Sequence, residues 1–356
     1  MLHRFAIFVA ACTVLLILAG SLVTSHDAGL SVPDWPTSYG WNMFTFPPSM
    51  WVANILYEHG HRLIASTVGF LTIILAVWLW LADPRGWLRW FGVAALGSVV
   101  AQGILGGITV LFFLPAAVST AHAGLAEIFF CMTVAIALFT SPQWTAGYGA
   151  SQLDGTSSGL KHDAKAEVPY EDAPGDLRGV DDARLRRLAT AATVLVYSQI
   201  LIGATMRHTG AGLAIPDFPW MFGHVVPDHW SQAIAVHFAH RVGALVVTSA
   251  ILTASAYVWS RHRERRELTR PAALLPALVA MQVALGALTV LSQRNPWINS
   301  FHVVGGALVL TTSLVLTLRS WRVRFASEIP EPRRAQRQEH TISEVSSGVR
   351  RDGARA

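Results

Sequence analysis

Eight long apolar runs divide this 356-residue chain, and they constrain its fold more than any other feature. A helix that crosses a bilayer needs about 20 consecutive apolar residues, and each run reaches roughly that length. Helices are expected because lipid offers no hydrogen-bond partners to an open backbone. We therefore predict an all-α, polytopic membrane protein with eight transmembrane helices. The runs cover residues 5–24, 55–82, 89–113, 118–140, 188–207, 233–259, 272–291 and 300–320.

The composition excludes a soluble single domain and a disordered protein. Charged residues make up 14% of the chain, whereas about a quarter is usual in soluble domains. Apolar residues make up 52%, and the mean hydropathy is +0.42. The net charge of +5 does not indicate nucleic-acid binding, because the basic residues lie in the loops between the apolar runs. The first run is too long for a signal peptide, and we interpret it as a span.

The basic residues also predict an orientation. They precede the first run, occupy the even-numbered loops and fill the C-terminal tail, and the loop 261–270 alone holds five arginines. The odd-numbered loops hold few. By the positive-inside rule, both termini are expected in the cytoplasm. We expect a multi-pass protein of a bacterial-type plasma membrane.

Two polar segments separate the chain into domains. Residues 141–186 are rich in Gly, Ser, Asp and Glu, which predicts a flexible cytoplasmic linker. The linker joins an N-terminal domain, residues 1–140, to a C-terminal domain, residues 187–325. Residues 326–356 are polar and charged, and we expect a disordered cytoplasmic tail.

The two domains are internal repeats. AGLSVPDWP at 28–36 returns as AGLAIPDFP at 211–219, 183 residues later. QGILGGITV at 102–110 returns as QVALGALTV at 282–290, 180 residues later. Each half has four spans in the same order, so the repeats are parallel. We predict two pseudo-symmetric four-helix bundles.

Four histidines are in register in this repeat. His61 matches His240 at an offset of 179, and His122 matches His302 at an offset of 180. All four lie near the outward ends of their spans. Ionisable residues in a bilayer are costly and are functional candidates, and neutral imidazole is a common metal ligand. Two histidines on facing helices can bind one haem iron from both sides. A lone interfacial histidine would be unremarkable, but four in register predict two bis-histidine metal sites.

Small and basic residues surround these histidines. Arg62 and Arg241 directly follow two of them, and they either neutralise the propionates of a porphyrin or extend to the membrane interface. Glycines near the histidines would let a macrocycle approach the backbone, although glycine is also common where membrane helices pack. These glycines are Gly106, Gly107, Gly124, Gly286, Gly305 and Gly306.

The halves differ in their carboxylates. Glu58 lies one helical turn before His61, and its repeat counterpart is His237; Glu127 aligns with Ala307. A carboxylate beside a haem can donate a proton or stabilise a developing cation. This asymmetry predicts a reactive N-terminal half and an electron-transfer C-terminal half. The alternative to a chemical role for Glu58 is a carboxylate that is simply stabilised by the helix dipole. For Glu127 we prefer a polar contact between packed helices over a chemical role. The Glu-x-x-His spacing of a di-iron site occurs in one half alone.

These motifs together resemble the haem A synthase family. The resemblance covers about residues 1–140 and 187–320 and is carried by LHRFA, the two AGL-x-x-PD-aromatic-P loops, EHGHR, HAGLAE, HFAHR and FHVVGG. It implies an oxidoreductase that converts haem O into haem A by oxidising the C8 methyl to a formyl group. By motif match, the catalytic residues are Glu58, His61 and His122 at the haem O iron. The haem b ligands are His240 and His302.

The resemblance also frames what the sequence leaves open. Some family members carry a cysteine pair in the first outward loop, where this chain has none, so the electron donor is unknown. Expected partners are haem O, haem A and the bilayer, with a haem O synthase, terminal oxidase assembly factors and a second copy of the chain as candidates. Two other functions stay open at this point: a dihaem cytochrome that takes electrons from quinol, and a transporter with paired histidines.

Overall fold

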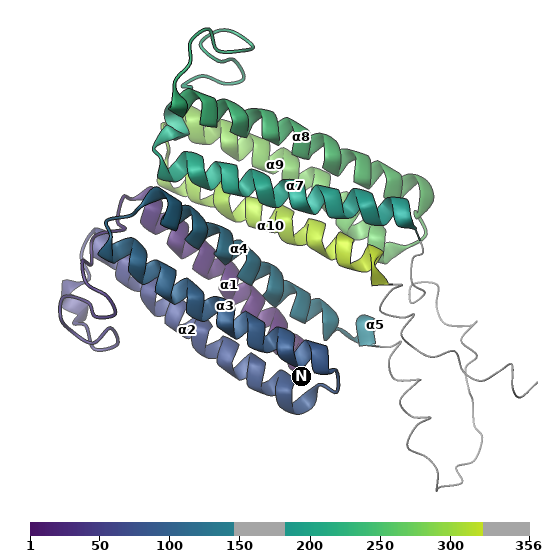
Figure 1. Ribbon diagram of the computed structural model, residues 1–356, viewed down its shortest axis with the longest axis horizontal. Coiled ribbons are helices and arrows are strands. Elements are labelled where there is room, and N and C mark those ends of the chain that lie inside the picture. The colour runs from purple at the N-terminus through teal and green to yellow at the C-terminus, as the bar shows by residue number, and fades with distance from the viewer. Residues whose placement is uncertain (146–181, 323–356) are drawn as a thin grey trace, which may run out of the picture.

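The computed structural model describes residues 1–145 and 182–322, and the regular elements of this part are all helices, without a β-strand. Eight helices in it are long and apolar enough to cross a membrane, which confirms the all-α, eight-span prediction (Figure 1). They are α1 (Leu2–Ser25), α2 (Asn54–Ala82), α3 (Gly86–Leu111), α4 (Ala116–Phe139), α7 (Ala183–His208), α8 (Gln232–Arg261), α9 (Arg266–Leu291) and α10 (Pro296–Ser320).

Three short helices complete the described structure. The 3-10 helices η1 (Pro48–Met50) and η4 (Ala211–Leu213) lie in the long loops, and α5 (Pro142–Thr145) follows α4. Most of the predicted linker, and the whole of the predicted tail, lie outside the described residues.

Several helices extend beyond the apolar runs because polar caps fix their ends. Helix α7 begins at Ala183, five residues before its run, since the Asp182 side chain accepts hydrogen bonds from the backbone N–H groups of Arg184 (2.9 Å) and Leu185 (3.0 Å). Asn295 caps α10 in the same way. An apolar run marks the part of a helix that faces lipid, whereas the cap satisfies the free N–H groups where the helix begins.

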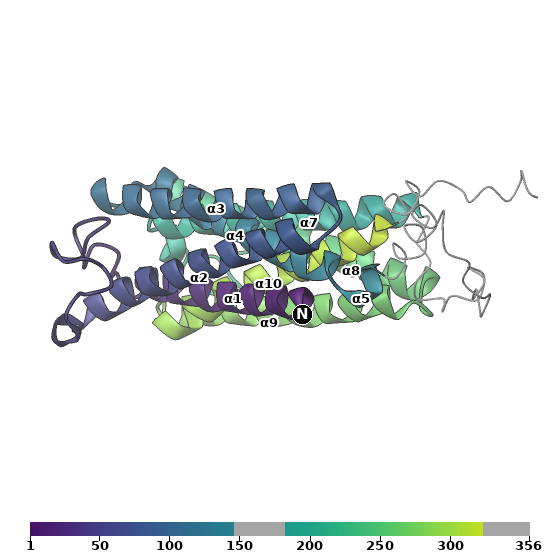
Figure 2. The same ribbon diagram turned by 90° about the horizontal axis from the view of Figure 1, so that it is seen from below.

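The long helices form two groups that lie side by side along one direction (Figures 1 and 2). Each of α1 to α4 packs against two neighbours of its own group, and α7 to α10 do the same. The groups meet where α1 and α4 contact α7 and α10. These contacts are consistent with the predicted pair of pseudo-symmetric bundles. A small apolar cluster of Ala10, Phe130 and Ala307 lies at the junction.

Polar groups also join the two bundles, at the end where the long loops lie. Arg207, in the last turn of α7, donates to the Ser21 carbonyl (2.8 Å) and to the Ser25 hydroxyl (2.8 Å) of α1. The Ser25 hydroxyl lies 3.0 Å from that of Ser300 on α10. A guanidinium at a helix C-terminus is favoured by the helix dipole, and here it also ties the N-terminal group to the C-terminal group.

We expect Arg207→Met to loosen this junction. The variant loses charge-assisted hydrogen bonds to two serines, each worth roughly 1.5–3 kcal/mol, and should unfold several degrees lower in detergent. The control is Arg294→Met, because the Arg294 side chain is 39% exposed and pairs with Asp27 at 3.6 Å. Equal unfolding temperatures for both variants would contradict the role given to Arg207.

Candidate functional site

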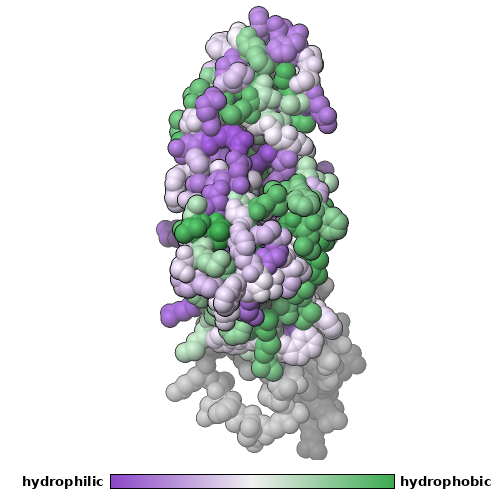
Figure 3. Space-filling view, turned by 90° about the vertical axis from the view of Figure 1, so that its left-hand side faces the viewer, coloured by the Kyte–Doolittle hydropathy of each residue, from purple (hydrophilic) through white to green (hydrophobic). Residues whose placement is uncertain are grey.

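The four registered histidines gather at the loop end of the molecule. Each lies in the first three turns of its helix, α2, α4, α8 or α10, and these four helices begin at the same end. Figure 3 views this end directly and shows hydrophilic and hydrophobic residues mixed over its surface. The histidines therefore lie in the helix turns next to the loops.

Two of the histidine rings rest on glycines of the preceding helix. A Cβ atom added to Gly20 on α1 would lie 2.9 Å from Cε1 of His61. A Cβ added to Gly203 on α7 would lie 2.8 Å from Cε1 of His240. Both separations are shorter than real Cβ contacts, so each ring needs a glycine at this place. Gly20 and Gly203 are 183 residues apart, the same offset as the loop motifs.

The other two rings rest on glycines in the same way. A Cβ on Gly106 of α3 would lie 3.3 Å from Cε1 of His122, and one on Gly286 of α9 would lie 3.1 Å from Cε1 of His302. Each histidine thus has a glycine partner on the preceding helix of its own half. The sequence singled out Gly106 and Gly286 but not Gly20 and Gly203, whose shared repeat offset was a usable signal.

The histidines form one pair in each half. The ring centres of His240 and His302 are 6.5 Å apart, with the ring planes at 74°. Two imidazoles that bind one metal ion from opposite sides, at a nitrogen–metal distance of about 2 Å, have centres roughly 6 Å apart. The separation in this pair therefore fits one shared metal ion. His61 and His122 lie within electrostatic range of each other, and the Nδ1 atoms of both have no hydrogen-bond partner among the described residues.

Glu58 is buried and holds the loop that follows α1. Its Oε2 accepts a hydrogen bond from the Val32 backbone N–H (2.7 Å), and its Oε1 accepts one from Arg62 (2.7 Å). The repeat counterpart His237 is also buried, and its Nδ1 lies 3.3 Å from the Ile215 backbone nitrogen. A carboxylate and an imidazole thus contact equivalent loop positions, and the N-terminal half alone carries an acidic group there.

Arg62 and Arg241 also bind the loops. Each guanidinium donates hydrogen bonds to three backbone carbonyls at equivalent positions in the two repeats. The acceptors are Val32, Asp34 and Thr37 for Arg62, and Ile215, Asp217 and Trp220 for Arg241. These bonds fix each loop to the turn that carries a histidine. Pairing with porphyrin propionates stays a prediction for both arginines.

One aromatic side chain lies against α3 at the level of His122. A Cβ added to Gly107 on α3 would lie 2.5 Å from Cδ2 of Trp35, so the indole rests on that glycine. Gly107 follows Gly106, on which His122 rests. The C-terminal half has Ala287 at the position that matches Gly107.

Glu127 lies deeper in α4 and is buried, with 4% of its surface exposed. Its Oε2 has no hydrogen-bond partner within residues 1–145 and 182–322. The packing contact predicted for Glu127 therefore involves no hydrogen bond at this oxygen among the described residues.

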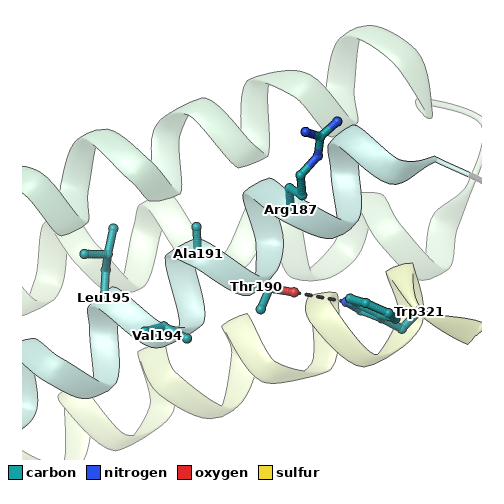
Figure 4. Close-up of a pocket in the computed structure, with 6 residues that line it drawn as sticks. All are labelled: Arg187, Thr190, Ala191, Val194, Leu195 and Trp321. Carbon is teal, nitrogen blue, oxygen red and sulfur yellow. Dashed lines mark hydrogen bonds between the residues drawn. The ribbon is translucent and has the colours of Figure 1, made fainter.

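A cavity of about 630 Å³ lies at the other end of α7, near its junction with the end of α10. Figure 4 shows its lining residues, among them Thr190, whose hydroxyl accepts a hydrogen bond from Trp321 Nε1 at 3.0 Å. The lining contains no histidine or carboxylate. This cavity is separate from the histidine pairs.

Comparisons with known proteins decide which family this arrangement represents. Residues 3–314 match the family model of the cytochrome oxidase assembly proteins, COX15-CtaA. Haem A synthase of Symbiobacterium thermophilum is 30% identical over 315 residues, covering 86% of this chain and 92% of the relative. The chain belongs to the haem A synthase family. Haem A synthases of Shouchella clausii and Rhizobium etli are each 26% identical and cover 92% and 91% of this chain, and 97% and 89% of their own lengths.

Membership of the haem A synthase family confirms the resemblance drawn from the motifs. It fits a multi-pass membrane protein with eight spans. The relatives do not favour the two other functions left open by the sequence, the dihaem cytochrome and the transporter. The matched region includes all four registered histidines and both repeated loops.

The repeated loops should respond to acid through their aspartates. Burial raises the pKa of Asp34, but hydrogen bonds from Gly40, Thr37 and Tyr39 outweigh it, and the pKa lies below the ordinary 3.8. A carboxyl with a lowered pKa stabilises the folded loop above its ordinary value, and this contribution is lost as the pH falls through the folded value. We expect the Tyr39 and Gly40 amides to keep full protection from hydrogen exchange at neutral pH and to lose it below about pH 3.8.

Asp34→Asn should lose about tenfold of that protection already at neutral pH, because an amide oxygen replaces only one of the two acceptors. Asp228→Asn is the control, since the Asp228 side chain is 62% exposed. Unchanged protection in Asp34→Asn would show that the carboxylate does not hold the loop.

Proposed function

We propose that this protein is a haem A synthase that oxidises the C8 methyl group of haem O to a formyl group. The observation that carries the proposal is the pair of matched histidine sites, each ring resting on a glycine, in a member of the haem A synthase family. Dioxygen is the oxidant in this proposal: in each of two rounds one oxygen atom hydroxylates the C8 carbon, and the other leaves as water with two electrons and two protons from an external donor. The first round gives a hydroxymethyl group, the second gives a geminal diol, and loss of water leaves the aldehyde.

The two halves take different roles in this proposal. His61 and His122 bind the iron of the substrate haem O in the N-terminal half, and His240 and His302 bind haem b in the C-terminal half. The fit rests on the 6.5 Å between the His240 and His302 rings and on the glycine contacts of His61 and His122, which match those of His240 and His302. When bound, haem b supplies one-electron redox chemistry.

The side chains of the N-terminal half orient the substrate and exclude water. Trp35 limits access at the level of His122, because its indole lies on Gly107. Glu58 is the acidic group next to the histidine pair, and its carboxylate holds or releases a proton, or balances positive charge that develops at the oxidised methyl. Its bonds to Val32 and Arg62 keep the carboxylate at one place beneath the loop.

The membrane setting and the partners complete the proposal. The protein crosses a bacterial-type plasma membrane with both termini on the cytoplasmic side. The histidine pairs, at the opposite ends of the helices, therefore lie near the outer surface. Haem O reaches the N-terminal half from a haem O synthase, and haem A leaves toward terminal oxidase assembly factors. The first loop contains no cysteine. The electron donor therefore passes its electrons to this protein by a route that does not use a cysteine pair there.

We expect Glu58→Ala to lower the haem A yield at least tenfold while haem b is retained. The measurement is chromatography of haems extracted from cells that also make haem O. Glu58→Gln is the matched variant, because its amide oxygen still accepts the Val32 N–H bond but carries no charge. If Glu58→Gln makes haem A normally, the carboxylate acts only as a loop anchor. Normal yield from both variants would remove Glu58 from the chemistry.

The glycine partners allow each half to be tested separately. Val at Gly203 should displace the His240 ring, since the new Cβ lies 2.8 Å from it, and should cost most of the haem b absorbance. Val at Gly20 should spare haem b and reduce haem A formation, because it displaces His61 instead. Loss of haem b from Gly20→Val with full retention in Gly203→Val would reverse the assignment of the halves.

A further inference from the structure

A glutamine is bonded to His240 in the C-terminal half. Gln199, on α7, donates from Nε2 to the His240 carbonyl at 2.7 Å, and the same nitrogen lies 2.9 Å from Nδ1 of His240. A Cβ added to Gly243 would lie only 2.1 Å from Oε1 of Gln199. Gly243 comes three residues after His240 on α8. The glutamine can reach the histidine because that position has no side chain.

His302 has a second glutamine arranged in the same way. Gln282, on α9, donates from its side-chain Nε2 to the His302 carbonyl at 2.7 Å, and the backbone carbonyl of Gln282 accepts from Nδ1 of His302 at 3.2 Å. A Cβ added to Gly305 would lie 2.3 Å from Oε1 of Gln282. Gly305 comes three residues after His302. Each histidine of this half therefore has a glutamine and a glycine that makes room for it.

The N-terminal half lacks the first arrangement. Leu16 stands where the repeat has Gln199, and Ile64 follows His61 by three residues where Gly243 follows His240. Gln102 matches Gln282 and its backbone faces His122, but Leu125 replaces the glycine. The glutamine–glycine pairs distinguish the halves at the helix turns that carry the histidines.

We propose that Gln199 is a positioning residue that fixes the His240 ring, so that the C-terminal half holds its haem permanently while the N-terminal half exchanges its haem. This inference rests on the proposed function. Hydrogen bonds to the second nitrogen of a ligating histidine fix the ring and its tautomer. Fixing a side chain before it binds removes an ordering cost from the binding step. His61 has no such bond and is suited to a substrate that enters and leaves.

The tautomer is consistent with this role. An imidazole that binds iron through Nε2 carries its proton on Nδ1. The Gln282 backbone carbonyl accepts that proton for His302. For His240, a half-turn of the Gln199 amide places Oε1 as the acceptor of the Nδ1 proton, and the amide then gives up its bond to the His240 carbonyl.

The first experiment converts the C-terminal pair into its N-terminal equivalent. The double variant Gln199→Leu/Gly243→Ile introduces the residue types of Leu16 and Ile64, the counterparts in the N-terminal half. The isoleucine side chain fills the space next to residue 199 that Gly243 leaves open. Haem b should leave the purified, full-length variant at least tenfold faster, measured as transfer to apomyoglobin. The reciprocal variant, Leu16→Gln/Ile64→Gly, should slow the release of haem from the N-terminal half and leave haem b unchanged.

A second variant separates ring positioning from packing and covers the case in which the double variant fails to fold. Gln199→Glu keeps the shape but places a carboxylate against the His240 ring, which makes the imidazole a stronger donor to iron. We expect the equilibrium constant for haem b reduction to fall at least about tenfold, a shift of about 59 mV, with a changed low-spin electron paramagnetic resonance signal. A glutamine that served packing alone would leave both readouts unchanged.

The outcomes test two claims separately. If the wild-type protein contains no haem b, or His240→Ala keeps it, the proposed function fails. If wild type holds haem b and His240→Ala loses it, the proposed function stands. In that case, dissociation within twofold of wild type in the double variant, or a Gln199→Glu potential equal to wild type, overturns the positioning role.

Discussion

The close approach of an imidazole ring to a glycine backbone determines how neighbouring helices pack at the loop end of this molecule. At Gly20 and Gly203 the histidine ring of the next helix occupies the place where a side chain would lie. The helix pairs α1–α2 and α7–α8 therefore approach closely at these glycines. In a bilayer, where apolar burial adds little to helix association, close packing at glycine is a main source of stability.

The loops depend on the same helix turns. His61 and Arg62 are consecutive, as are His240 and Arg241, so each histidine and its loop anchor share one turn of helix. The arginines bind backbone carbonyls that would otherwise be unpaired near the membrane surface. The conformation of each loop and the position of its histidine are therefore linked through the backbone of α2 or α8.

The sequence predicted the parts of the structure that lipid and repetition govern. The eight helices follow from apolar runs, and their ends differ because caps such as Asp182 extend them into polar residues. The register of His61 with His240 followed from the repeat. The partners of Arg62 were not predictable, because a backbone carbonyl has no residue signature. Gln199 was not predicted because its counterpart in the other repeat is Leu16. Comparing the repeats for identical residues does not identify a position at which they differ.

The loop anchors have a consequence for the history of the chain. The aspartate that closes the turn and the arginine that binds three carbonyls are the same in both halves, so they belong to the ancestral four-helix unit that existed before duplication. Glu58 against His237 and Leu16 against Gln199 are among the many positions at which the two halves differ. One loop-anchoring module thus presents two histidine pairs whose neighbouring side chains are different.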